Sequence, residues 1–418
     1  MKQRGKEVNG ILNKFIPALM AAISLFLWNC EENPLPVALA DRNSQIVIDT
    51  LYARFDTTYI LNKPISTLDS DRLLIGSSYG FSFQPIVRFS VETIPDTANI
   101  DSVWIRFITL QAGGQDLSEF AAIGYQVLGI WQTDTDYLWQ HYPARVNLTD
   151  PMGYLRVTTG KEDTLYFDFS EYGKEVIQAW IDSTRVNRGM VFDFNYATFI
   201  KEFKARDNVT QTGVHLFIRY TAGSDTVMIT DSLLAITDAF LFNGDFQEVP
   251  ERNQVSSLYP WATLLDFDLD SLKRKYPDGL VVTSANLQLP VDWANTLPHG
   301  GSGPDLQILP LLDGFSEKDS LEVDSSFIGI TTRVIDINRY TADSSFVEVT
   351  EGNDRRELAS TYIQRKLNFP DSYEGFFVEH KFQASYLARF SFFKHNFADP
   401  NRRPRLIIYS LRFPDERL

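Results

Sequence analysis

The stretch Ile100-Asp101-Ser102-Val103-Trp104-Ile105-Arg106-Phe107 carries an apolar side chain at every second position from Val103 onward. Successive side chains of a β-strand point to opposite faces, so Val103, Ile105 and Phe107 share one face. This period of two residues predicts a strand of an antiparallel sheet with one buried face. The stretch Val282-Thr283-Ser284-Ala285-Asn286-Leu287-Gln288-Leu289 follows the same pattern position by position. The same strand is therefore predicted twice in one chain.

Three further pairs of apolar segments recur in the same order along the two halves of the chain. They are residues 86–91 and 264–269, residues 191–194 after Gly189 and 376–378 after Gly375, and residues 216–220 and 406–409. Four landmarks in one order indicate an internal duplication with a unit of roughly 180 residues, which is the size of a domain. We therefore predict an all-β chain of two tandem jelly-roll-like antiparallel β-sandwiches, residues 46–222 and 226–412.

Helices are expected to be few. Residues 169–181 place Val176, Ile177 and Trp180 at helical spacing, and residues 350–367 form a second candidate. We expect each helix to close an open end of one sandwich.

The start of the chain has the composition of a secretory signal. Basic residues at its beginning are followed by an apolar stretch over residues 11–28, which is too short and too interrupted to span a bilayer. Residues 1–29 are therefore predicted to be a cleaved leader. The mature chain is expected to leave the cytoplasm.

Cys30 is the single cysteine of the chain, and it directly follows this leader. The arrangement resembles a bacterial lipoprotein signal peptide, whose cleavage leaves an acylated cysteine as the first residue. This resemblance implies anchoring to the outer membrane through lipidated Cys30, with residues 30–45 as a tether. Glu31 and Glu32 resemble an export signal to the cell surface. The alternative is an ordinary secretory signal followed by a chance cysteine.

Composition narrows the classes of partner. The chain has 418 residues and a formal net charge of −15, with 54 acidic and 39 basic side chains. Such a balance argues against nucleic acid as a partner and against a basic surface that lies on membranes. A single cysteine excludes an intramolecular disulfide, so stability must come from apolar cores.

Several short motifs resemble the DNRLRE family, a group of extracellular β-sandwich modules that is also classed among carbohydrate-binding modules. The matching segments are Arg88-Phe89, Ile94-Pro95, residues 100–107, residues 131–143 with their tryptophans and aspartates, Val176 to Trp180 before Gly189, and Pro404 to Ile408. The resemblance implies a β-sandwich fold and carbohydrate binding.

The aromatic run Trp131, Tyr137, Trp139 and Tyr142 is the candidate ligand-binding site. Aromatic rings offer flat apolar faces that can stack on the C–H groups of sugars. The alternative for Trp131 and Trp139 is the core, because tryptophans at family-defining positions are more often buried. Tyr137 and Tyr142 are expected to be freer to face solvent.

Motifs for metals and cofactors are absent from the sequence. The five histidines lack the His and Cys spacings of zinc sites. Asp266, Asp268 and Asp270 alternate, so a strand through them would place all three on one face. These aspartates could bind calcium through their carboxylate oxygens. The alternative is that they lie on the outer face of the sheet, exposed to solvent. We predict no cofactor, with calcium open at a site that the sequence does not locate.

The leading hypothesis is a non-catalytic surface lipoprotein that binds extracellular polysaccharide or mediates adhesion. An accessory subunit of an outer-membrane protein assembly is the alternative, and an enzyme that cleaves polysaccharides is the third candidate. An exposed aromatic strip would favour binding of a glycan, a broad apolar patch would favour assembly, and a cleft with converging carboxylates would favour catalysis.

Overall fold

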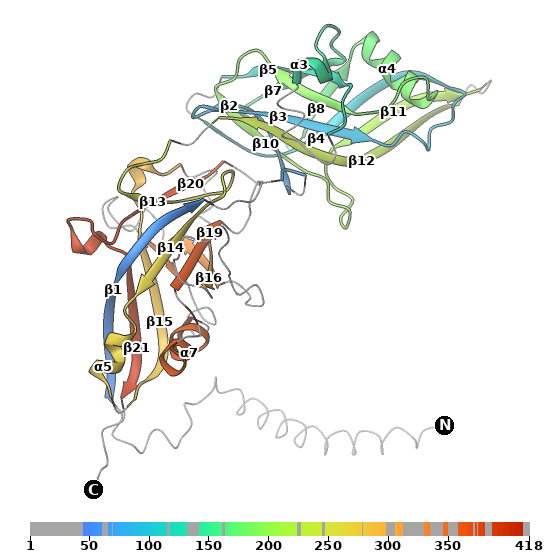
Figure 1. The fold of residues 1–418 in the computed structure, drawn as a ribbon. Helices are drawn as coiled ribbons and strands as arrows, with labels where there is room; N and C mark the ends of the chain where they lie inside the picture. The colour runs from blue at the N-terminus through green and yellow to red at the C-terminus, as the bar shows by residue number, and fades with distance from the viewer. Residues whose placement is uncertain are drawn as a thin grey trace, which may run out of the picture.

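The computed structural model describes residues 45–412, apart from residues 61–65, 69, 115–117, 132–141, 161–163, 224–226, 245–246, 278, 298–305, 312–329, 335–345, 350–357, 371–372, 374 and 381–386. This part of the chain is built mainly from antiparallel strands in two lobes (Figure 1). The all-β, sandwich-like prediction is confirmed. Every helix within the described residues is too short or too polar to cross a bilayer.

The first lobe, here called the inserted lobe, comprises residues 66–244 and closes on itself as a ring of strands. In ring order these are β3 (Phe81–Phe89), β9 (Met190–Phe194), β5 (Phe120–Val127), β7 (Gly153–Val157), β8 (Thr164–Phe169), β4 (Ala98–Gly114), β11 (His215–Ala222) and β12 (Met228–Asn243). Two more strands, β2 (Arg72–Ser78) and β10 (Phe199–Lys204), pair with each other and extend the sheet. The short β6 (Val146–Asn147) pairs with the end of β5.

The second lobe, here called the split lobe, comprises residues 45–60 and 247–412. Its closed barrel runs in the order β1 (Gln45–Ile60), β14 (Trp261–Phe267), β19 (Gly375–His380), β16 (Leu306–Leu311), β17 (Ile330–Val334), β18 (Phe346–Val349), β15 (Val281–Pro290) and β21 (Arg405–Arg412). A separate pair, β13 (Arg252–Ser256) and β20 (Arg389–Phe393), lies beside it.

The two rings have the same order of strands. In the inserted lobe Asp101 is the extra residue in the pairing of β4 with β11, because Arg219 lies opposite Ser102 and Tyr220 opposite Ile100. In the split lobe the register of β15 against β21 shifts between Val282 and Ser284, so Thr283 holds the same place. The two strands therefore share a bulge at the same position, as two copies of one strand would.

The alternating residues of both repeats point inward as predicted. Val103, Ile105 and Phe107 lie in the core of the inserted lobe, and Ala285, Leu287 and Leu289 lie in the core of the split lobe. All of these side chains are at most 5% exposed. Burial of one face therefore fixes which way each strand is turned.

The first strand of each copy pairs outside the predicted sequence unit. The limits 46–222 and 226–412 group β1 with the first copy and β12 with the second. In the structure β1 pairs with β14 and β21 of the split lobe, while β12 pairs with β3 and β11 of the inserted lobe. The inserted lobe is thus one continuous segment placed between β1 and β13, and it is a circular permutation of the other lobe.

Both of these strands bend at the same point. The register shifts between Ala53 and Phe55 in β1 and between Ala235 and Thr237 in β12. Shortly after each shift a buried aspartate accepts a backbone N–H from the end of a neighbouring segment. Asp56 accepts from His395 N at 2.6 Å, and Asp238 accepts from Arg206 N at 2.7 Å. Each aspartate therefore fastens the bent strand to its lobe.

Asp238 makes the stability of the inserted lobe depend on pH. Burial raises the pKa of Asp238 from 3.8 to about 6, despite the opposing contact with Arg206. The folded chain therefore binds this proton more tightly than the unfolded chain does, so stability falls as pH rises from 3.8 through 6. We expect Asp238→Asn, which keeps an oxygen acceptor, to stabilise the protein by about 1–3 kcal/mol at pH 8 and by little at pH 4.

Chemical denaturation at the two pH values measures this difference. Asp238→Ala is the control, because it leaves Arg206 N without its acceptor and should destabilise at both pH values. Equal stabilisation by Asp238→Asn at pH 4 and pH 8 would contradict the assignment.

An apolar cluster joins the two lobes. Phe81, Phe83 and Phe240 of the inserted lobe pack with Leu258 and Trp261 of the split lobe. The ring of Phe81 meets that of Tyr259 edge to face at 6.3 Å between centroids, and the Tyr259 hydroxyl donates to Gly244 O. The lobes therefore meet through buried rings as well as through the chain itself.

One of the two predicted helices is described in full and the other only in part. Helix α4 (Glu171–Ile181) buries Val176, Ile177 and Trp180 against the inserted lobe, which confirms the predicted helical face. The second candidate begins to be described at η4 (Leu358–Gln364), a π-helical stretch, and continues as α7 (Arg365–Asn368). A further short helix, α5 (Asp270–Lys275), follows β14.

Candidate functional site

Trp131 is the only predicted ligand-binding residue whose side chain the structure describes. Its ring is fully buried, and its indole Nε1 donates to Arg188 O at 2.7 Å. A ring without exposed surface offers no face for a sugar, so of its two predicted roles the burial of Trp131 fits the core. Tyr137 and Trp139 lie outside the described residues. Tyr142 begins α3 (Tyr142–Arg145), but its side chain is likewise outside the description.

The described residues before and after the aromatic segment lie side by side and form what we call its base. Leu128 N and Gly129 N both donate to Arg145 O, at 2.7 and 3.2 Å. Trp131 holds one side of this base through Arg188, and Val127 N donates to Gly189 O at 3.0 Å on the same side. The described residues on either side of this segment, Trp131 and Arg145, are therefore both tied to neighbouring parts of the inserted lobe.

A groove of about 600 Å³ opens beside this base, and we call it the base groove. Its walls come from the end of β5, from β6, from the first turn of α4 and from the segment after α4. The lining residues are Gln126, Val127, Leu128, Asn147, Asp150, Tyr172, Arg185, Val186 and Arg188. Its volume falls within the range of small-molecule sites.

Helix α4 positions one wall of the base groove. Ser170 caps the helix: its hydroxyl oxygen accepts from Gly173 N at 3.1 Å and its Oγ–H donates to Pro151 O at 2.8 Å. Gly173 allows the helix to approach the chain closely, because a Cβ at this position would lie 2.0 Å from Met152 O. The first turn thereby brings Tyr172 to the groove.

The polar groups of the groove hold the Tyr172 ring in place. Asn147 Nδ2 donates to the Tyr172 hydroxyl at 2.8 Å. The guanidinium carbon of Arg185 lies 5.9 Å from the centre of the Tyr172 ring, within the range of a cation–π contact. The ring is thus fixed at its hydroxyl and covered in part by a cation.

Two arginines of the groove carry unused hydrogen-bonding capacity. Within the described residues, the guanidinium groups of Arg185 and Arg188 neither donate a hydrogen bond nor form an ion pair. This is unusual in a chain with 54 acidic side chains, where carboxylates are plentiful. The ten N–H donors on the two groups thus have no acceptor among the residues that the structure describes.

Comparison of the chain with models of protein families, with curated proteins and with solved structures found no match. The resemblance to the DNRLRE family therefore rests on its sequence motifs alone. Function must be argued from the groove itself, because a fold of this class hosts many functions.

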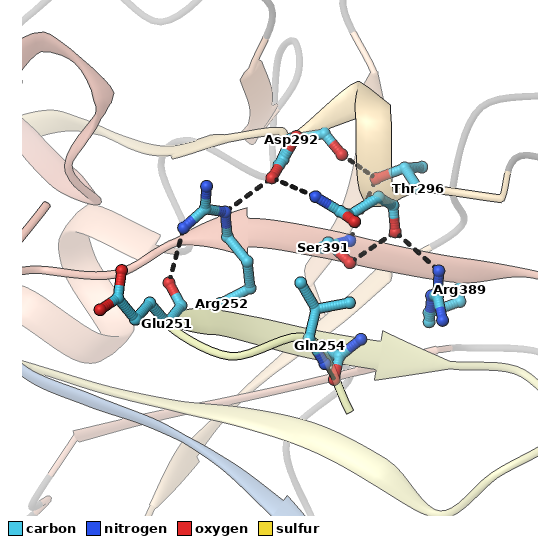
Figure 2. Close-up of polar contacts among 9 residues, drawn as sticks. Glu251, Arg252, Gln254, Asp292, Thr296, Arg389 and Ser391 are labelled. Carbon is cyan, nitrogen blue, oxygen red and sulfur yellow. Dashed lines mark hydrogen bonds and ion pairs between the residues drawn. The ribbon is translucent and has the colours of Figure 1, made fainter. Parts of the chain in front are cut away.

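A second polar cluster lies in the split lobe (Figure 2). Arg252 Nε donates to Asp292 Oδ2 at 2.6 Å, and Ser391 Oγ and Arg389 donate to Asn295 O at 2.7 and 3.1 Å. Burial alone would raise the pKa of Asp292, but hydrogen bonds from Asn295 and Arg252 outweigh it and lower the pKa. These contacts tie the turn after β15 to β13 and β20, so we assign the cluster a structural role.

The aspartate series does not form the single face that alternation predicts. Strand β14 ends at Phe267, and Asp270 already belongs to α5. Asp266 accepts from Arg54, and Asp268 accepts from Arg274 at 2.7 Å. Among the described side chains, no group of three or more His, Cys, Asp or Glu is placed to hold a metal ion.

Sequence reasoning did not find Tyr172, Arg185 or Arg188. The available signal was the position of the two arginines after a predicted helix and just before the apolar strand that follows Gly189. Pattern analysis treats such residues as a solvated loop, because nothing in the spacing shows which other loops face them.

Proposed function

We propose that the protein is a non-catalytic surface lipoprotein whose inserted lobe binds an acidic polysaccharide in the base groove. The observation that carries this proposal is the pair of guanidinium groups of Arg185 and Arg188 beside the Tyr172 ring, which form no hydrogen bond or ion pair with any described residue. The resemblance to carbohydrate-binding DNRLRE modules supports the same class of ligand.

The groove has the chemistry that a uronic acid or sulfated sugar requires. A guanidinium group offers a planar fork of donors that fits a carboxylate or sulfate through two parallel hydrogen bonds. Asn147 and Asp150 add an amide and a carboxylate that can meet sugar hydroxyls. The exposed part of the Tyr172 ring can contact the apolar face of the sugar.

The described lining of the groove does not resemble the site of a glycosidase. Hydrolysis of a glycosidic bond uses a pair of carboxyl groups on either side of the bond. Asp150 is the single carboxylate among the described lining residues. This favours binding over cleavage.

The position of the groove suits a surface receptor. Residues 31–44 lie between Cys30 and β1 in the sequence, so a lipid anchor would hold the beginning of β1 near the membrane. Strand β1 then runs along the split lobe toward the inserted lobe (Figure 1), over its 16 residues. A strand of that length spans roughly 50 Å. The base groove would thus be presented away from the membrane.

The test is binding of residues 31–418 to an array of neutral and acidic polysaccharides, with and without calcium. We expect saturable binding to acidic chains, weakened about 10- to 100-fold by Arg185→Ala combined with Arg188→Ala, because charge-assisted hydrogen bonds are lost. Arg156→Ala is the matched control, since Arg156 is an exposed arginine of the same lobe that pairs with Glu119 outside the groove. An array without any bound glycan would overturn the proposal and favour the role of an assembly subunit.

A further inference from the structure

The end of the split lobe that lies away from the inserted lobe collects several chain segments. Helix α5, helix α7, the beginning of β1 and the end of β21 meet there (Figure 1). Lys275 forms an ion pair with Asp49 of β1, and the side chain of Gln364 accepts from Val282 N at 2.8 Å. The guanidinium carbon of Arg412 lies 6.0 Å from the centre of the Tyr276 ring. We call this end the anchor-side end, because the chain enters the fold here.

The described residues of the anchor-side end are mainly basic, although the chain as a whole is acidic. Its described basic residues are Lys273, Arg274, Lys275, Arg365, Lys366 and Arg412. Its described acidic residues are Asp49, Asp266, Asp268 and Asp270. Asp49, Asp266 and Asp268 are already paired with Lys275, Arg54 and Arg274. The described residues of this end therefore include more basic than acidic side chains, in a chain of net charge −15.

Exposed apolar side chains accompany these cations. Ile46 and Ile48 of β1 are 73% and 61% exposed, and Phe369 at the end of α7 is 65% exposed. Val281 of β15, which is 43% exposed, lies opposite Leu411, and Leu411 lies opposite Ile46. Leu411 itself is buried, so the exposed members of this apolar row are Val281 and Ile46 on either side of it. Basic residues around exposed aliphatic and aromatic side chains match the two layers of a membrane surface, charged headgroups over acyl chains.

A hollow of about 270 Å³ opens within the same end, between α5 and α7. Leu272, Leu280 and Leu367 form its apolar wall, and Lys273 lies at its lining together with Gln364. An apolar wall with a nearby cation can accept the upper part of a lipid with a phosphate headgroup.

We propose that the anchor-side end seats directly on a membrane surface that carries phosphate headgroups. The proposal rests on the proposed lipid anchor, because an extended tether of 14 residues between Cys30 and Gln45 reaches at most about 50 Å. Within that reach the lipid anchor keeps the anchor-side end close to the bilayer. Attraction between its basic residues and the phosphate headgroups then orients the split lobe with its exposed apolar side chains toward the lipid. The lipid anchor then acts together with a second, weaker contact, as stable membrane attachment generally requires.

Sedimentation of residues 31–418 with lipid vesicles tests this inference without the anchor. We expect binding to vesicles of phosphatidylcholine with about one third phosphatidylglycerol, and weaker binding to phosphatidylcholine alone or at high salt. Lys273→Ala with Arg365→Ala should weaken binding about fivefold per charge removed. The matched control is Arg156→Ala with Lys204→Ala, which removes the same charge from the inserted lobe and should leave vesicle binding unchanged.

Equal sedimentation with both kinds of vesicle, or an equal loss in the control variant, would overturn the inference. The polysaccharide array separates this result from failure of the proposed function. Lys273→Ala with Arg365→Ala should keep full glycan binding, since neither residue lines the base groove.

Discussion

A fragment of residues 66–244 is expected to fold on its own, whereas a fragment of residues 46–222 is expected to remain unfolded. The first contains every strand of the closed ring in the inserted lobe, including β12. The second lacks β12, which pairs with β11 on one side and with β3 on the other. Its absence would open the ring, expose two strand edges and remove the buried side chains of Ala235, Phe240 and Leu241.

Near-ultraviolet circular dichroism and a cooperative thermal transition measure this difference between the fragments. A chain that lacks residues 1–60 is the control, because it removes β1 from the split lobe and leaves every strand of the inserted lobe. We expect this chain to keep the transition of the inserted lobe and to lose that of the split lobe. The reverse outcome, a folded 46–222 and an unfolded 66–244, would show that β1 pairs with β3 and β11.

Trp131→Ala is expected to destabilise the inserted lobe by about 3–5 kcal/mol and to abolish glycan binding. The substitution removes a fully buried ring that packs with Ile86, Val127 and Val191. It also removes the N–H donor to Arg188 O, a backbone carbonyl that lies two residues before the start of β9 at Met190. Thermal unfolding of the full chain, followed through the transition of the inserted lobe, measures the loss.

Trp131→Phe separates the two contributions. It keeps most of the apolar volume and loses the N–H donor, so we expect a smaller cost of about 1–2 kcal/mol. Wild-type stability in Trp131→Ala would mean that the ring does not belong to the core, and would return Trp131 to the candidates for ligand contact.

The strands were predictable because the alternation of apolar and polar residues that identifies each strand lies within a few consecutive residues. One face of each strand is buried, and the alternation of Val103, Ile105 and Phe107 records this directly. The ungapped match of residues 86–91 with 264–269 also agrees with strand pairing, since Asp238 lies opposite Val87 and Asp56 opposite Leu265.

The exchange of first strands was not predictable from alternation, because both strands carry the same pattern. Asp49-Thr50-Leu51-Tyr52-Ala53-Arg54-Phe55-Asp56 and Asp231-Ser232-Leu233-Leu234-Ala235-Ile236-Thr237-Asp238 share Asp, Leu, Ala and Asp at the same spacing. Either strand would present the same inward residues to either ring. The difference lies in chain order: β1 precedes the other strands of its ring, whereas β12 follows the other strands of its ring. The sequence pattern of a single strand does not show this order of pairing.

The candidate site was predictable only at its base. The tryptophan at position 131 belongs to the loop beside the base groove, but its own side chain is buried. Tyr172, Arg185 and Arg188 come from a helix and a loop about 40 to 60 residues farther along the chain, and the closed ring brings them to the end of β5. The spacing of residues in one sequence does not show which distant segments the fold brings together.

Binding in the base groove can be located by hydrogen–deuterium exchange of residues 31–418, with and without the polysaccharide that binds most tightly on the array. We expect slower exchange in peptides that cover residues 126–128, 147–150 and 185–188, with no change in the strands of the split lobe. Protection confined to the split lobe, or spread over the outer faces of the sheets with none at residues 185–188, would contradict a binding site in the base groove.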